Sequence, residues 1–272
     1  MIPLLLKKIL RTWSLALLIA IIFFLFMSAL FPRTRPLLDG VRLYFQKHII
    51  TAVADIRYRY QVWKEVDLTK VLSSRRLSPW DILFTSEESS LGSAFIEGKW
   101  KHMLLYLWTS RQLKLLLGKD SPFFQKVQSL NFSEKTPLII ESTFDGVQIH
   151  PFSDLKPRET FSAFRLELSK AKLRQGIESL SSSLWKSYDF DFNLEDKSQM
   201  YCSELLYPVF LERGLSPKTE EGIWRTVISP DAMLASLLDV HLPKRMVHFL
   251  FYVASKDGKP YFMNKEQLFL IL

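Results

Sequence analysis

The stretch from Tyr201 to Tyr207 constrains the fold more than any other, because it contains the only cysteine, Cys202. Residues 188–192 alternate aromatic and acidic side chains ahead of it, which predicts a strand. The apolar residues after Cys202 predict a buried helix with this cysteine in its first turn. Free backbone N–H groups and the helix dipole favour a thiolate there. A lone cysteine among apolar residues is most often a small buried hydrophobe, so a catalytic interpretation needs a partner histidine elsewhere.

Charge is distributed unevenly along the chain. The 272 residues carry a formal charge of +8, and residues 1–76 hold 13 Lys and Arg against 4 Asp and Glu. The remainder is close to neutral, which argues against a nucleic-acid-binding core and suits a basic segment beside anionic lipid headgroups. A single cysteine excludes an internal disulfide and a cysteine-based zinc site.

Residues 1–36 are predicted to form a membrane anchor. Residues 12–32 carry no charge, and roughly 20 helical residues span the hydrocarbon core of a bilayer. A cleaved signal peptide is the alternative, but the long run without a clear small-x-small cleavage site favours an uncleaved signal anchor. Basic residues flank the run on both sides, so the positive-inside rule is nearly balanced. We expect a single-pass protein of the bacterial inner membrane, with an extracytoplasmic domain and membrane lipid as a partner.

Residues 37–76 are predicted to form a long basic, amphipathic helix. Apolar residues recur at helical spacing from Leu38 to Trp63, and Arg and Lys occupy the opposite face. Two interpretations stay open. The helix is either a basic stalk lying on the membrane or a helix packed on the following domain with a solvated basic face.

Residues 77–272 are predicted to form a globular domain. Strands are expected at 79–85, 100–107, 137–142, 147–152, 161–168, 246–254 and 261–262. Helices are expected at 169–185, after Cys202, and at 229–238 with Pro230 in the first turn. The insertion at 109–135 predicts one or two short apolar helices. These form either a cover over the active-site groove, suited to a lipidic substrate, or a satellite core of their own.

Four motifs occur in an order shared with a known family. They are Asp81-Ile82-Leu83-Phe84, Lys101-His102-Met103-Leu104-Leu105-Tyr106, Leu138-Ile139-Ile140-Glu141 and Tyr201-Cys202-Ser203-Glu204-Leu205. Residues 78–255 thereby resemble the circularly permuted papain-like cysteine amidases, the YiiX-like branch of the NlpC-type fold, related to lecithin:retinol acyltransferases. The resemblance implies an α+β domain with a small antiparallel sheet packed on the cysteine-bearing helix. The chain departs from the family at Trp80, where Gly is usual, and at Lys101, where Ser is usual.

The resemblance also implies a catalytic triad. Cys202 would be the nucleophile, His102 the general base and then acid, and Glu141 the carboxylate that orients the imidazole. A histidine that takes the thiol proton stabilises the thiolate, and a carboxylate on its other nitrogen steadies the imidazolium. We expect the thiol about 3–4 Å from one ring nitrogen of His102, Glu141 at the other, and Cys202 opening onto a groove.

Further residues near the motifs are assigned lesser roles. Packing, supporting or oxyanion-site roles are expected for Tyr106, Tyr201, Ser203 and Glu204. The backbone N–H of Cys202 is the expected oxyanion donor. His150 is a second candidate base, but it precedes Pro151 at a strand end and is interpreted as structural. Asp189 and Asp191 lack further ligands at metal-binding spacing, so no metal or cofactor is expected.

Three functions fit these features. The first is a membrane-anchored cysteine hydrolase that cleaves an amide in a cell-wall peptide or a lipid-linked acyl amide. The second is an acyltransferase that forms a thioester on Cys202 from a lipid donor. Both share an acyl-enzyme and differ only in what attacks it. The third is a non-catalytic lipid- or peptide-binding module of the same fold, in which the thiol would keep its ordinary pKa.

Overall fold

The computed structural model describes residues 40, 43–44, 47–48, 77–86, 98–155, 159–221, 226–239, 243, 246–256 and 259–263. The chain divides into two units, Met1–Ile50 and Thr51–Leu272. Described residues of the first unit are helical, and Nδ1 of His48 lies 2.7 Å from the carbonyl oxygen of Tyr44. The predicted anchor and most of the predicted amphipathic helix lie outside the described residues. None of the described helices has the length and apolar character needed to cross a membrane.

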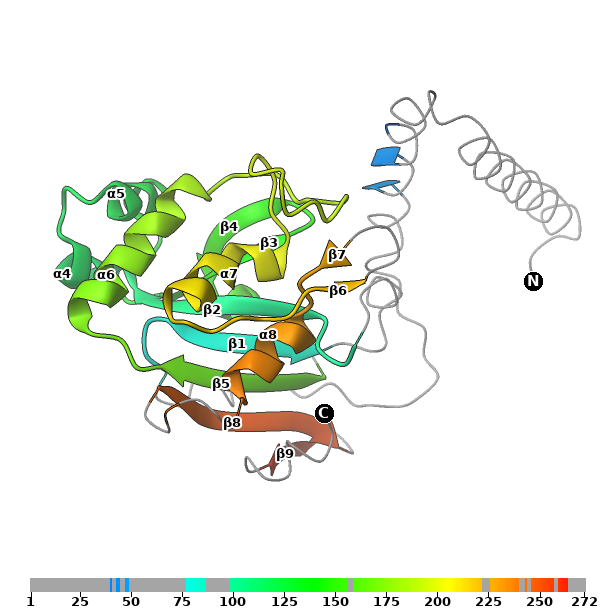
Figure 1. Ribbon diagram of the computed structural model, residues 1–272. Coiled ribbons are helices and arrows are strands. Elements are labelled where there is room, and N and C mark those ends of the chain that lie inside the picture. Colours follow the sequence, from blue (N-terminus) through cyan, green and yellow to red (C-terminus); the bar gives the residue numbers. More distant parts are fainter. Residues whose placement is uncertain are drawn as a thin grey trace, which may run out of the picture. The chain divides into compact units, whose positions relative to one another are not determined.

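A seven-stranded antiparallel sheet organises the described part of the second unit (Figure 1). Its strands are β1 (Asp81–Ser86), β2 (His102–Thr109), β3 (Pro137–Thr143), β4 (Gly146–Pro151), β5 (Thr160–Leu166), β8 (Val247–Lys256) and β9 (Lys259–Met263). They run in the order β4-β3-β2-β1-β5-β8-β9. An antiparallel sheet was predicted, but as a small one; it is larger because the C-terminal hairpin β8–β9 extends it beyond β5.

Helices cover one face of this sheet, as Figure 1 shows for α7 and α8. The helical segments are α4 (Ser110–Leu117), α5 (Pro122–Ser129), η3 (Phe152–Asp154), α6 (Lys170–Ser179), η4 (Leu180–Ser182), α7 (Cys202–Glu212) and α8 (Pro230–Leu237). The Ser169 side chain accepts the backbone N–H of Lys172, and that of Ser229 accepts the N–H of Ala232, so each serine caps the start of its helix, α6 or α8. The short pair β6 (Glu220–Glu221) and β7 (Thr226–Val227) was not predicted.

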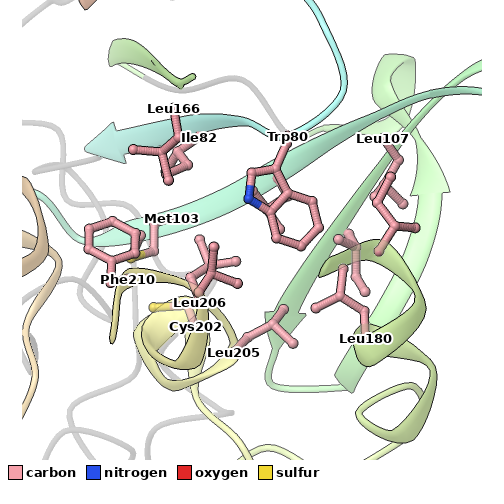
Figure 2. Packing of buried hydrophobic residues seen from close by; sticks show 14 of the residues in the cluster. Trp80, Ile82, Met103, Leu107, Leu166, Leu180, Cys202, Leu205, Leu206 and Phe210 are labelled. Carbon is pink, nitrogen blue, oxygen red and sulfur yellow. The ribbon is translucent and has the colours of Figure 1, made fainter. Parts of the chain in front are cut away.

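The central strands are apolar on both faces because both faces are buried. Ile82 and Met103 belong to the main core, together with Leu206 of α7, whereas Leu83 and Leu104 belong to a second cluster. Neighbouring residues of a strand point to opposite faces of the sheet, which explains the division. Figure 2 shows the main core between the sheet and α7.

The insertion at 109–135 forms α4 and α5, in agreement with the predicted short helices. The side chains of Leu113, Phe123, Phe124 and Val127 are buried and belong to the main core. They extend that core toward α6 and η4, so they neither face an open groove nor form a core of their own. Among the apolar residues of the insertion, Leu115 is the exposed one, at 76%.

The strand predicted at 188–192 is wrong. The carboxylate of Asp189 accepts the backbone N–H groups of Asp191 and Asn193, at 2.8 and 2.6 Å. These bonds fold the backbone into a turn instead of leaving its N–H groups for a neighbouring strand. Phe192, with a φ of 52°, completes an irregular loop that leads to α7.

Trp80 packs on α6 at a position where only glycine leaves room. Its side chain is 2% exposed, and its backbone N–H donates to the carbonyl of Tyr106 at 2.8 Å. A Cβ atom on Gly176 would lie 2.8 Å from the indole ring. Gly176 therefore serves close packing between helix and strand.

A buried ion pair joins β1 to β5. The Arg165 guanidinium donates to both oxygens of Asp81, at 2.7 and 2.8 Å, and the Ser78 N–H donates to the same carboxylate at 2.7 Å. Asp81 is fully buried. Burial raises the pKa of this carboxyl, and the hydrogen bonds from Arg165 and Ser78 oppose the rise.

Candidate active site

Cys202 is the first residue of α7, which confirms the predicted position in the first turn of a buried helix. Two hydrogen bonds hold that end of the helix. The Ser142 hydroxyl donates to the carbonyl of Met200 at 2.5 Å, and the Tyr201 hydroxyl accepts the N–H of Ile228 at 3.2 Å. The cysteine is thereby fixed against β3, at a helix start where backbone N–H groups have no intrahelical acceptor.

The thiol lies at the margin of the main core. Cys202 is 4% exposed and shares a cluster with Met103, Leu205 and Leu206 (Figure 2). The predicted opening onto a groove does not match this burial, since Cys202 belongs to a buried cluster with side chains of β2 and α7. The side chain of His102 is more accessible, at 15%.

His102 and Glu141 are brought together by adjacent strands. His102 is the first residue of β2, and Glu141 lies on the neighbouring strand β3. Nε2 of His102 lies 2.5 Å from Oε2 of Glu141. This contact leaves Nδ1 as the ring nitrogen that can serve the thiol of Cys202, and His102 is close enough to that thiol to lower its pKa against the effect of burial. The three residues implied by the resemblance therefore converge, although a hundred residues separate the first from the last.

The charges of these groups support one another. Burial favours a neutral imidazole, but the Glu141 carboxylate and the Cys202 thiolate outweigh it and raise the pKa of His102 to about 9. Burial likewise opposes ionisation of Cys202, yet hydrogen bonds and charge from His102 lower the pKa of its thiol. The backbone N–H of Met103 adds to that lowering. Both shifts favour an imidazolium–thiolate pair near neutral pH.

Glu141 carries a second contact that the sequence analysis missed. Its other oxygen, Oε1, lies 2.6 Å from Nε2 of His150 on β4. Burial would raise the pKa of Glu141, but the two histidines hold it well below its usual range. The interpretation of His150 as merely structural placed it apart from the site, whereas the structure places it against the same carboxylate. The hairpin pattern could have indicated this, because residues paired across two strands share a face.

The supporting residues lie at varied distances from the thiol. Ser203 Oγ is 3.8 Å from the sulfur of Cys202. Glu204 lies in the first turn of α7, buried, with Lys197 Nζ at 3.2 Å from its Oε1. The Tyr201 hydroxyl accepts the backbone N–H of Ile228, the residue that follows β7. Tyr106 packs its ring edge on Phe152, with centroids 5.9 Å apart.

The described residues offer no metal centre. No group of three or more His, Cys, Asp or Glu side chains there is arranged to hold a metal ion. Asp189, one of the two acidic residues considered from the sequence, uses its carboxylate to shape the loop before α7.

Known proteins provide a further comparison. Residues 76–254, more than half of the chain, match the family described as permuted papain-like amidase enzyme, YaeF/YiiX, C92 family. The chain belongs to this family of permuted papain-like amidases. No curated protein matches it.

Membership in the permuted papain-like amidases has two consequences for the functions considered above. The chain is an enzyme of an amidase and peptidase type, so a non-catalytic binding module is disfavoured. The matched range spans β1 to β8, and therefore includes Cys202, His102 and Glu141. Residues 1–75, with the predicted anchor and most of the amphipathic helix, lie outside the match.

Proposed function

We propose that this permuted papain-like amidase cleaves an amide with a Cys202–His102–Glu141 triad, acting on a cell-wall peptide or a lipid-linked acyl amide at a membrane. The observation that carries the proposal is the 2.5 Å contact of Glu141 with His102, whose other nitrogen is left for a thiol at the start of α7. The thiol, the imidazole and the carboxylate thus follow one another in space as nucleophile, general base and orienting group, which is the arrangement that acyl transfer needs.

Bond formation begins at the sulfur of Cys202. The thiolate attacks the amide carbonyl carbon, and the carbonyl oxygen becomes an oxyanion. The backbone N–H of Cys202 can bind that oxyanion, because it lies at the helix start and has no intrahelical acceptor. The His102 imidazolium then gives its proton to the leaving nitrogen, the C–N bond breaks, and an amine departs from a Cys202 thioester.

Hydrolysis of the thioester completes the reaction. Neutral His102 takes a proton from water, whose oxygen attacks the thioester carbonyl and forms the carboxylic acid. The C–S bond breaks, the sulfur leaves as a thiolate, and His102 is again an imidazolium. Glu141 stays ionised throughout and holds Nε2. An acyltransferase would differ only in the acceptor that replaces water.

The membrane part of the proposal rests on the N-terminal sequence. The uncharged run at 12–32 and the basic surplus of residues 1–76 favour a signal anchor beside anionic lipid. Sequencing the N-terminus of the mature protein tests this; a chain that begins after Ala29 would mean a cleaved signal peptide. A reporter fused to the C-terminus identifies the membrane face.

An acyl adduct on Cys202 tests the chemistry. The full chain is incubated with a panel of cell-wall peptides and long-chain acyl amides, quenched, and measured by intact mass. We expect an added acyl mass that is absent from Cys202→Ala and reduced in His102→Ala. Because the chain has one cysteine, the adduct needs no further assignment. The proposal fails if no substrate gives an adduct or a product while the thiol titrates near its ordinary value of about 8.5.

A further inference from the structure

We propose that His150 is a positioning residue of this centre: it binds the second oxygen of Glu141 as a cation, and so limits how strongly that carboxylate holds a proton on His102. The inference rests on the proposed function, because it concerns the same triad. It assigns a fourth side chain to the site and predicts which way the basicity of His102 changes without it.

The geometry begins with the hairpin of β3 and β4. Glu141 pairs with Gln148 and Ile139 with His150, so His150 is the diagonal neighbour of Glu141. Glu141 and Ile139 share a face because they are two residues apart, and His150 joins that face from across the pair. Long side chains bridge such a diagonal, and Oε1 of Glu141 lies 2.6 Å from Nε2 of His150.

Both ring nitrogens of His150 face acceptors. Nε2 meets the Glu141 carboxylate, and Nδ1 lies 3.2 Å from the carbonyl oxygen of Pro151. A neutral imidazole has one N–H and can donate to only one of them, whereas an imidazolium donates to both. Burial alone would lower the pKa of His150, but its contacts with Glu141 on β3 and the carbonyl of Pro151, together with the charge of Asp154 on η3, raise it.

Glu141 is therefore shared between two rings. Its oxygens lie at 2.5 Å from Nε2 of His102 and 2.6 Å from Nε2 of His150, and its side chain is 6% exposed. A carboxylate that accepts from two cations is a weaker partner for each, since the cations repel one another and divide its charge. Two opposed bonds also fix the plane of the carboxylate, which orients His102.

The chemical benefit concerns the second half of the acylation step. His102 must hold a proton until the amide nitrogen takes it, and proton transfer is most efficient when the donor's pKa lies near the working pH. With His150 present, the pKa of His102 is raised to about 9. Without the cation of His150, the full negative charge of Glu141 would act on His102, and the imidazole would hold its proton more tightly.

The test substitutes His150 and follows His102 directly. His150→Gln keeps a donor toward Glu141 and removes the cation; His150→Lys keeps a cation. The imidazole titrations are followed by NMR in the full chain, which has five histidines, with the His102 signal assigned by its loss in His102→Ala. We expect the pKa of His102 to rise by about one unit in His150→Gln and to return toward the wild-type value in His150→Lys.

A matched control is available in the same sheet. His248 on β8 lies 3.2 Å from Glu167, in an exposed pair. His248→Gln is the same substitution outside the site and should leave the titration of His102 unchanged. The proposal is overturned if His150→Gln leaves the pKa of His102 unchanged or lowers it, or if the control shifts it equally. This readout needs no turnover, so it is independent of whether Cys202 forms an acyl adduct.

Discussion

Replacing Glu141 with glutamine should remove the thiolate from this enzyme at neutral pH. The substitution keeps the length of the side chain and a hydrogen-bond acceptor for His102, but it removes the charge. The carboxylate supports the imidazolium against burial, which alone favours a neutral ring. Without that charge, the proton shared by Cys202 and His102 should reside on the sulfur.

The magnitude follows from the shift at His102. Its pKa is raised from an ordinary 6.5 to about 9, and each unit corresponds to about 1.4 kcal/mol. Loss of the carboxylate should therefore cost the imidazolium on the order of 3 kcal/mol, because burial subtracts from the net shift while Cys202 adds to it. The pKa of His102 should fall to 6.5 or below, and the thiol of Cys202 should return toward about 8.5.

Thiolate absorbance in the ultraviolet measures this without a substrate. Wild type and Glu141→Gln are titrated, and Cys202→Ala supplies the background because no other cysteine contributes. Wild type should show thiolate at neutral pH, and Glu141→Gln only at alkaline pH. Glu167→Gln, which alters the exposed partner of His248, is the control and should match wild type. A Glu141→Gln protein that keeps its thiolate at neutral pH would refute the electrostatic role of this carboxylate.

Three further predictions concern stability, measured as the free energy of unfolding in denaturant. Gly176→Ala should destabilise wild type by about 1–2 kcal/mol through its contact with Trp80, but should be neutral or stabilising in Trp80→Phe; the same loss in both backgrounds would contradict the packing argument. Arg165→Gln should cost about 2–3 kcal/mol, because it leaves Asp81 buried without its cation, and adding Asp81→Asn should recover part of it. As the pH falls below 4.5, the ordinary pKa of the Glu141 carboxyl, stability should fall more steeply in wild type than in Glu141→Gln. The native pKa of Glu141 is lowered, so the unfolded state binds the proton first and protonation favours unfolding. Parallel stability curves for the two proteins would contradict this prediction.

The sequence predicted most strands of the domain because the central ones are buried on both faces and turn residues bound them. The strand at 188–192 was predicted from its alternating side chains. In the structure the Asp189 carboxylate accepts the backbone N–H groups that a strand would need, and side-chain periodicity does not reveal such hydrogen bonds. Cys202, His102 and Glu141 were found through the order of family motifs; their spacing alone would not have joined them.

His150 was missed for a different reason. Between the strands expected at 137–142 and 147–152, the pair Asp145-Gly146 is typical of a two-residue hairpin turn, whereas the hairpin turns one residue earlier, with Thr143 opposite Gly146. A turn at either place leaves His150 on the same face as Glu141, because the two registers differ by two residues and side chains alternate with period two. The information was therefore present in the chain, but it needed a strand-pairing argument in addition to a motif.

The contact between Trp80 and Gly176 joins two positions that must change together. A glycine at position 80, the residue that the family resemblance leads one to expect there, would remove the indole that lies against Gly176. A side chain at position 176 would then have room to fill the same space from the helix. Volume at this junction can be supplied from the strand or from the helix, but not from both. In this chain, a smaller residue at position 80 alone would leave a void, and a larger residue at position 176 alone would clash with the indole.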